Sequence, residues 1–242
     1  MKSAVPALTL TLLCLSAALV VAMALPRGAQ MRVPAPNTLT AAEKAAGWRL
    51  LFDGRTTAGW RGFRKTDMPA GWTVEDGALT RTAAASDIVT IDQFGDFELA
   101  FEWKVVPAGN SGVFCRVTEG STAVWHSAPE YQILDNAGHE DGKKPETSAG
   151  SIYALYAPVK DATRKPGEWN QARIVMKGTH LEHWLNGVKL VECEIGSPDW
   201  NARVAQSKFK TYPQFGKATR GFIAIQDHGD WVSYRNIKVK IL

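Results

Sequence analysis

Apolar and polar residues alternate along most of the chain after residue 48, in many short runs that turn residues separate. The clearest run covers residues 97–105, where large apolar side chains occupy every second position. Successive side chains of a β-strand point to opposite faces of a sheet, so each run predicts a strand with one buried face. Asp76-Gly77 and Asn186-Gly187 separate pairs of runs and suit two-residue hairpin turns. Many short antiparallel strands of this kind predict an all-β antiparallel sandwich.

Two segments depart from this alternation and predict short helices. Thr40 followed by Glu43 is a capping-box pattern, which predicts a helix over residues 41–46. Ser197 followed by Pro198 predicts a second helix that runs to about residue 207. We therefore expect a β-sandwich with one or two short helices.

Residues 1–29 predict a secretory signal peptide. Lys2 precedes a nearly continuous apolar run over residues 8–25, and small residues follow it. A membrane anchor is the alternative, but the run is borderline in length for spanning a bilayer. We expect an exported protein, periplasmic or secreted, without stable membrane insertion after cleavage. Residues 30–46 then form a linker and the short helix, and residues 47–242 form one domain.

The charge and the cysteines limit the possible partners and cross-links. The formal net charge is +4 and no long basic run exists, so nucleic acid is a poor candidate partner. Cys115 and Cys193 are the two cysteines outside the leader. They form a disulfide in an oxidising compartment or remain as two buried thiols, and the sequence does not choose between these alternatives. The absence of a Cys-x-x-Cys motif argues against a structural zinc site.

A few polar side chains interrupt the apolar strands. Glu130 and Gln132 stand two residues apart in a strand-like run, so their side chains share one face. Gln226 and His228 repeat this spacing, and Arg116 ends a third run. A carboxylate in an apolar strand must find a partner or change its pKa. The alternatives are a turn cap for His228 and a rim ion pair for Arg116. We hypothesise that the five side chains converge in one hollow of the sheet.

Aromatic residues suggest a carbohydrate partner. The chain has nine tryptophans, and Trp125 and Trp184 are among those that fall near turns or strand ends. Apolar ring faces stack on the C–H faces of sugars, although most tryptophans in a sandwich simply pack the sheets. A small carbohydrate is therefore the expected substrate.

Several motifs together resemble the 3-keto-disaccharide hydrolase domain family, in order from residue 47 to residue 242. The resemblance implies a concanavalin A-like jelly roll of two antiparallel sheets, export by bacteria, and action on glycosides already oxidised at C3 of the sugar. Cys115 is a small departure, because an aromatic residue is commoner there. The motifs are residues 47–54 (GWRLLFDG), 59–60 (GW), 110–114 (NSGVF), 130–136 (EYQILDN), 150–153 (GSIY), 167–170 (GEWN), 183–187 (HWLNG), 225–229 (IQDHG) and 235–237 (RNI).

On such a substrate the C3 ketone acidifies the proton on C2. A base that removes this proton forms an enolate, which expels the C1 substituent, and addition of water completes a net hydrolysis. The reaction needs a base, an electrophile beside the C3 oxygen and an acid for the leaving group. We expect Glu130 or His139 as the base and His228 as the acid or a metal ligand. Arg116, Gln132 or a divalent metal is expected to polarise the ketone.

The metal would be calcium or a transition metal, and no organic cofactor is expected. Asp135, His139 and Asp141 are the most ligand-like cluster for it, although their spacing follows no fixed metal motif. The residues expected to bind substrate are Gln132, Gln226, Trp125, Trp184 and Tyr153.

Two other functions fit the same fold. A retaining endoglucanase needs two carboxylates about 5 Å apart on one face, but Glu130 and Asp135 face opposite ways and the usual Glu-x-Asp-x-x-Glu strand pattern is absent. A non-catalytic carbohydrate-binding module stays open. The number of ionisable groups near the expected binding face favours an enzyme over a stacking platform.

Overall fold

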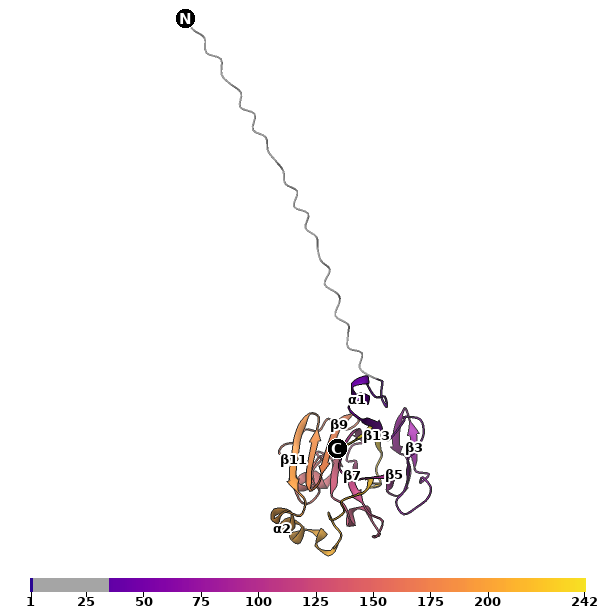
Figure 1. The fold of residues 1–242 in the computed structure, drawn as a ribbon, viewed down its shortest axis with the longest axis vertical. Helices are drawn as coiled ribbons and strands as arrows, with labels where there is room; N and C mark the ends of the chain where they lie inside the picture. Colours follow the sequence, from indigo (N-terminus) through magenta and orange to yellow (C-terminus); the bar gives the residue numbers. More distant parts are fainter. Residues whose placement is uncertain (2–34) are drawn as a thin grey trace. The chain divides into compact units, whose positions relative to one another are not determined.

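The computed structural model describes Met1 and residues 35–242, and the predicted signal peptide lies outside the described residues (Figure 1). Both predicted helices are present. Helix α1 (Ala41–Ala45) begins after Thr40, whose side chain and that of Glu43 form the expected capping box. Helix α2 (Pro198–Gln206) begins after Ser197, which accepts the Trp200 backbone N–H. Within residues 35–242, no helix combines the length and apolar character needed to cross a bilayer.

The strands form two antiparallel sheets, which confirms the predicted β-sandwich. The larger sheet has the order β11-β10-β9-β6-β13-β4-β3, with β1 also paired to β13, and the smaller has the order β2-β5-β12-β7-β8. The larger sheet comprises β1 (Trp48–Leu50), β3 (Trp72–Glu75), β4 (Ala78–Arg81), β6 (Phe97–Val105), β9 (Asn170–Lys177), β10 (His180–Leu185), β11 (Val188–Glu194) and β13 (Val232–Ile241). The smaller sheet comprises β2 (Trp60–Gly62), β5 (Ile88–Phe94), β7 (Asn110–Val117), β8 (Glu130–Leu134) and β12 (Gly221–Ile225). Short 3-10 helices are η1 (Val124–His126), η2 (Glu140–Lys143), η3 (Pro145–Thr147) and η4 (Lys208–Thr211).

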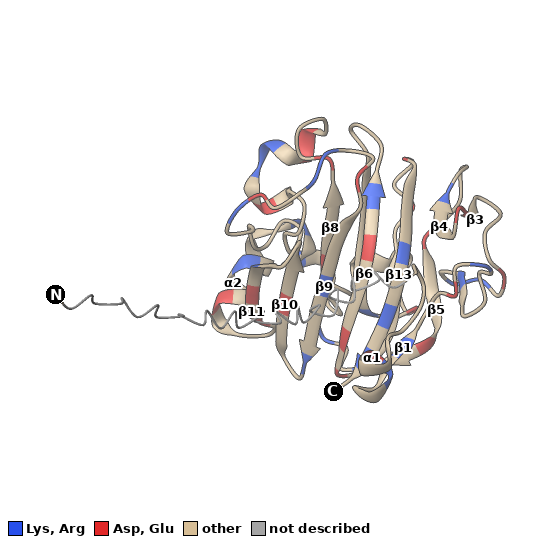
Figure 2. Ribbon diagram, turned by 90° about the horizontal axis from the view of Figure 1, so that it is seen from above, with Lys and Arg blue, Asp and Glu red and all other residues tan. Residues whose placement is uncertain are grey.

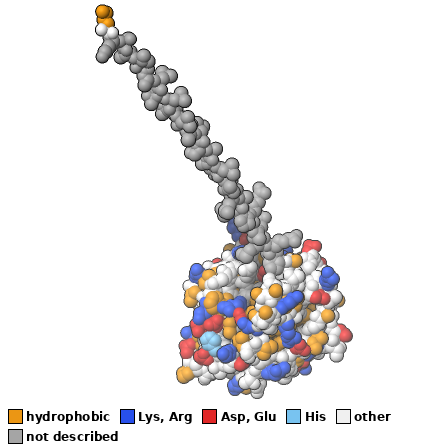
Figure 3. All heavy atoms as spheres, turned by 45° about the horizontal axis from the view of Figure 1, so that its top comes forward, with side chains coloured by type: hydrophobic (Ala, Val, Ile, Leu, Met, Phe, Trp, Pro, Cys, Tyr) orange, Lys and Arg blue, Asp and Glu red, His pale blue; other side chains and the backbone are white. Residues whose placement is uncertain are grey.

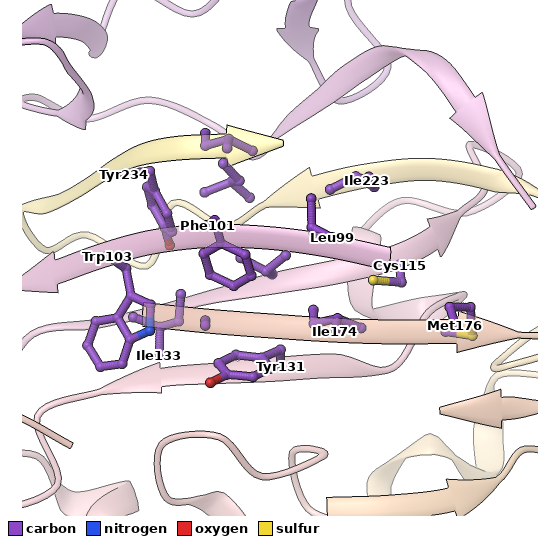
Figure 4. Packing of buried hydrophobic residues seen from close by; sticks show 14 of the residues in the cluster. Leu99, Phe101, Trp103, Cys115, Tyr131, Ile133, Ile174, Met176, Ile223 and Tyr234 are labelled. Carbon is purple, nitrogen blue, oxygen red and sulfur yellow. The ribbon is translucent and has the colours of Figure 1, made fainter. Parts of the chain in front are cut away.

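The core lies between the two sheets (Figure 4). Strand β6 alternates strictly between buried and half-buried residues, as its sequence predicts, and its inward side includes Phe101 and Trp103. Tyr131 and Ile133 of β8 meet this side from the smaller sheet, and the Phe101 and Tyr131 rings contact edge to face at 5.7 Å. The inward side of β8 is therefore apolar, so Glu130 and the other alternate residues of β8 point to the outer face of the smaller sheet.

Local turn chemistry also follows the sequence. Asp76-Gly77 joins β3 to β4 and Asn186-Gly187 joins β10 to β11, and all four residues have positive φ. Two consecutive residues with positive φ are what the favoured two-residue hairpin turn requires.

Cys115 and Cys193 are both free and buried, so the two-thiol alternative is the one that the structure shows. Burial raises the pKa of each thiol to about 12. A thiol that stays protonated is a poor nucleophile, so neither cysteine is suited to catalysis.

The two sheets differ in their outer faces. On the larger sheet, charged residues of both signs follow β6, β9 and β13 (Figure 2), and ion pairs such as Arg173–Glu98 and Arg235–Glu102, both 2.7 Å, connect them. The face shown in Figure 3 likewise intersperses both charges among small hydrophobic patches. On the smaller sheet, every residue of β7 and β8 is buried. Segments outside the sheet therefore cover the outer face of these two strands, where a polar pocket can be enclosed.

Candidate active site

A pocket of about 240 Å³ lies over the outer face of the smaller sheet. Strands β7 and β8 supply its floor, the loop after β12 supplies one side, and segments from η1, η2 and η4 complete the wall. Most of the predicted site residues therefore converge, the two from β8 by strand alternation and the others from loops and short helices. The lining residues are Asn110, Trp125, Glu130, Gln132, Asp141, Tyr153, Lys208, Gln226 and His228.

Glu130 is the buried carboxyl of this pocket, and only 6% of it is exposed. Its carboxyl lies over Gly112 on β7, where a Cβ atom would overlap it. The pKa of Glu130 is raised to about 8, chiefly by burial; the charge of Lys208 lowers it, and the charges of Asp87 and Asp141 raise it. A carboxylate with this pKa is a much stronger base than an exposed one and suits the removal of a carbon-bound proton at neutral or mildly alkaline pH.

Three amide oxygens in the pocket have no hydrogen-bond partner. Asn110 Oδ1, Gln132 Oε1 and Gln226 Oε1 account for three of the six buried side-chain polar atoms that lack a partner among the described residues. The Gln132 amide is held in place because its Nε2 donates to the Thr147 carbonyl at 3.2 Å. Buried acceptors without a partner are costly, so these oxygens are suited to a ligand that brings several hydroxyl donors.

His139 stands beside the pocket rather than among its lining residues. Its Nδ1 accepts the Asp141 backbone N–H at 3.1 Å, and its Nε2 lies 3.4 Å from the Asn110 side-chain amide. Both ring nitrogens therefore already have a neighbour within hydrogen-bond distance. Of the two predicted bases, Glu130 therefore has the available lone pairs.

His228 lies at the rim of the pocket. Strand β12 ends at Ile225, so His228 belongs to the following loop and not to a strand, which corrects the predicted run. Its side chain is 46% exposed, its Nδ1 lies 4.0 Å from Asp230 Oδ2, and its ring centroid lies 6.0 Å from that of His139. An imidazole at the opening can exchange protons with solvent and with a leaving group.

Arg116 lies outside the pocket, so its predicted catalytic position is wrong. Arg116 has a φ of +62°, and the pairing of β12 with β7 shifts register nearby, which breaks the alternation on which the prediction depended. The guanidinium donates to the Gly95 and Gly178 carbonyls at 2.9 and 2.7 Å and to Asp96 at 2.8 Å. Arg116 therefore joins the turn at Gly95 to the turn at Gly178, and its pair with Asp96 agrees with the alternative of a rim ion pair.

Trp184 also lies away from the pocket, on β10 of the larger sheet. Its neighbour His183 is buried and its Nδ1 is 3.1 Å from the Gly150 carbonyl oxygen, so Trp184 points to the outer face. The Trp184 Nε1–H donates to Glu182 at 2.7 Å, and the Arg173 guanidinium covers the ring at 4.2 Å. The ring face is therefore already covered and does not fit the predicted role in binding substrate.

The predicted metal ligands Asp135, His139 and Asp141 do not assemble into a site. Both carboxylate oxygens of Asp135 accept backbone N–H groups, at 2.8 and 3.2 Å. Asp141 accepts the Tyr153 hydroxyl at 3.2 Å, and His139 uses Nδ1 for a backbone N–H. One oxygen of Asp135 thus stabilises the local turn at Ala137, and the other joins this turn to Ala108 in the loop between β6 and β7.

Within residues 35–242, the one group of three ligand-type residues with atoms within 4.8 Å of one another is His180, Glu182 and Glu192. This cluster could hold a metal ion, but its residues belong to β10 and β11 of the larger sheet. Lys189 already pairs with both glutamates, and His180 contacts Glu194 at 2.7 Å. Because these charges are neutralised within the protein, the cluster fits a surface ion network, and no catalytic step is assigned to a metal.

Two lining residues escaped the sequence analysis. Asn110 begins the NSGVF motif, so the motif could have suggested it. Lys208 belongs to η4, after α2, and no pattern in the sequence connects it to the strands. Its ammonium lies 4.4 Å from the Tyr153 ring centroid and 5.1 Å from that of Trp125.

Comparison with known proteins agrees with the motifs. Residues 47–240 match the family described as the 3-keto-alpha-glucoside-1,2-lyase-like domain. A relative from Bacteroides thetaiotaomicron named 3-keto-disaccharide hydrolase is 36% identical over 231 residues, which cover 82% of this chain and 79% of the relative.

Solved structures show the same fold. A candidate glycosyl hydrolase from Parabacteroides distasonis superposes with a TM-score of 0.81 at 38% identity, covering 86% of this chain and all (100%) of that one. A second candidate glycosyl hydrolase from the same species gives a TM-score of 0.64 at 28% identity, covering 81% of this chain and 99% of that one. The resemblance predicted from the motifs is confirmed, and the chain belongs to the 3-keto-alpha-glucoside-1,2-lyase-like domain family.

Proposed function

We propose that the protein is a glycoside-cleaving enzyme that acts on sugars oxidised at C3, by deprotonation at C2, elimination and hydration. Family membership and the name of the 36% identical relative support this substrate class. The single observation that carries the mechanism is the buried Glu130 carboxyl, which faces a pocket lined by amide oxygens without partners.

Glu130 serves as the base in the first step. The C2–H bond breaks, its proton moves to the carboxylate, and the electron pair forms an enolate with the C3 carbonyl. Burial makes the ionised carboxylate basic enough for a carbon acid that the ketone has already activated. The amide oxygens of Asn110, Gln132 and Gln226 accept sugar hydroxyls and hold the ring so that C2 faces Glu130.

His228 serves as the acid for the leaving group. When the enolate collapses, the C1–O bond breaks and the departing oxygen takes a proton from the imidazole at the rim. Water then adds to C1 and gives its proton back to the His228 imidazole, and protonated Glu130 returns its proton to C2. The sum of the steps is hydrolysis, with no oxidation or reduction.

Glu130→Gln tests the proposal, because it keeps size and hydrogen bonding but removes the base. We expect turnover of a 3-keto-glucoside to fall by at least about 10²-fold, the usual contribution of a general base. The matched control is Glu140→Gln, which changes an exposed glutamate outside the pocket. Unchanged turnover in Glu130→Gln removes this residue from the mechanism. Sugar binding without any release by the wild-type protein would favour a non-catalytic module instead.

We also propose that the protein is exported, on the basis of the apolar leader over residues 1–29. Cell fractionation with N-terminal sequencing of the recovered protein tests this proposal. A mature N-terminus near residue 30 in the exported fraction is the expected result, and full-length protein that remains in the cytoplasm contradicts it.

A further inference from the structure

The pocket holds a lysine ammonium in a defined place. Lys208 projects from η4, and its Nζ lies 4.4 Å from the Tyr153 ring centroid, 5.1 Å from the Trp125 centroid and 5.4 Å from the Phe209 centroid. Tyr153 and Trp125 themselves line the pocket. Contacts between an ammonium and aromatic rings restrict where the charge can lie, without cancelling it.

No carboxylate of the described residues lies within ion-pair distance of this charge. Among the described residues Lys208 forms no ion pair, whereas four other lysines each pair with a glutamate. The charge of Lys208 nonetheless reaches the base, because it lowers the pKa of Glu130 against the effect of burial. Lys208 is therefore a cation that remains available to a ligand in the same pocket. The four paired lysines are Lys143, Lys189, Lys238 and Lys240.

The other candidates for an electrophile are already engaged. The Arg116 guanidinium binds two turn carbonyls and Asp96. The Gln132 Nε2 donates to Thr147, so this side chain offers only its oxygen. Oxygen acceptors repel a developing oxyanion, whereas an ammonium stabilises it.

We propose that Lys208 is a catalytic residue that donates to the C3 oxygen of the substrate and stabilises the enolate. This inference rests on the proposed function. As the C2 proton moves to Glu130, the C2–H electron pair forms the C2=C3 bond and the C3–O π pair moves onto the oxygen beside Lys208. That pair returns when the C1–O bond breaks, so Lys208 remains protonated throughout. The aromatic rings of Tyr153 and Trp125 position the ammonium.

The test separates proton removal from bond cleavage. A 3-keto-glucoside with a simple alkyl group attached to C1 through carbon has no C1 substituent that can leave, so NMR in D₂O follows exchange of its C2 proton without cleavage of that bond. We expect Lys208→Met to slow this exchange by about 10²–10³-fold, as loss of an oxyanion donor does, with Lys208→Arg retaining part of the rate. The matched control is Lys210→Met, an exposed lysine of the same 3-10 helix outside the pocket.

A second readout distinguishes catalysis from a structural role. Because the charge of Lys208 lowers the pKa of Glu130, Lys208→Met should move the acidic limb of the exchange profile to higher pH. Exchange within threefold of wild type, or normal exchange with slowed cleavage of an ordinary 3-keto-glucoside, overturns the assignment of Lys208. Absence of both exchange and cleavage in the wild-type protein overturns the proposed function instead.

Discussion

The Glu130 carboxyl lies over Gly112 of the adjacent strand, in space that any larger residue at position 112 would occupy. Gly112 lies within β7, so no turn requires a glycine at this position. The missing side chain leaves space for the Glu130 carboxyl. Gly112 itself is paired with Gln132 in the β7–β8 register.

Gly112→Ala should displace the carboxyl and lower kcat/KM by about 10²-fold, because a misplacement of about 1 Å at a reacting group costs that much. Overpacking should also cost about 1–3 kcal/mol of stability. Steady-state kinetics and urea unfolding measure both effects. Gly95→Ala is the matched control, since a Cβ there meets only the Thr219 carbonyl oxygen at an ordinary 3.5 Å. Full activity in Gly112→Ala would contradict the assigned position of the base.

The pH dependence of kcat/KM should show the raised pKa of Glu130. Only the ionised carboxylate can take the C2 proton, and burial holds its pKa at about 8. We therefore expect kcat/KM to rise about tenfold per pH unit on the acidic side and to level off above about pH 8. An acidic limb near 4.5, the ordinary value for glutamate, would show that the base is a solvated carboxylate.

Stability should also depend on Glu130 ionisation. The pKa of Glu130 is about 8 in the folded protein and 4.5 for an ordinary glutamate, so the folded state holds a proton that the unfolded state releases between these values. The contribution of Glu130 to the free energy of unfolding is fully present below about pH 4.5 and is lost as the pH rises through about 8.

Glu130→Gln removes that dependence, because its amide does not ionise. Thermal unfolding of the two proteins from pH 4 to pH 9 measures the difference. The variant should melt above wild type at pH 9, and the gap should close at the acidic end of the series. Parallel curves across the whole range would show that Glu130 is not desolvated.

Arg116 should contribute to stability and not to catalysis. Removal of its three bonds to turn carbonyls and Asp96 in Arg116→Ala should cost on the order of 3 kcal/mol, since hydrogen bonds to a charged group contribute about 1.5–3 kcal/mol. Arg116→Lys keeps the charge but loses the planar guanidinium, so its stability should lie between those of wild type and Arg116→Ala. Urea unfolding measures the cost. Lost turnover at unchanged stability would restore Arg116 to the catalytic set.

Much of the fold follows from local sequence rules. Alternation in β6, the Asp76-Gly77 and Asn186-Gly187 turns and the Ser197 cap all appear as predicted, because each is decided by neighbouring residues. The shared face of Glu130 and Gln132 also follows from alternation.

The errors arise where local rules stop. The positive φ of Arg116 redirects a side chain that strict alternation places on the pocket face. Lys208 lines the pocket because the chain returns to it after α2, in η4. No local sequence pattern predicts this return. The ligand-like appearance of Asp135 is explained by a turn, because carboxylates that accept backbone N–H groups are common at chain reversals.

The base and the cation come from different kinds of scaffold. Glu130 belongs to β8 of the smaller sheet, whereas Lys208 belongs to a short segment that joins α2 to β12. Changes around Lys208 in that segment can therefore alter which sugars are accepted, as long as Lys208 itself is kept, while the strand that carries the base stays intact. Sequence diversity among relatives should concentrate in the residues around Lys208 between α2 and β12, with Lys208 itself and the strands of the pocket floor held nearly constant.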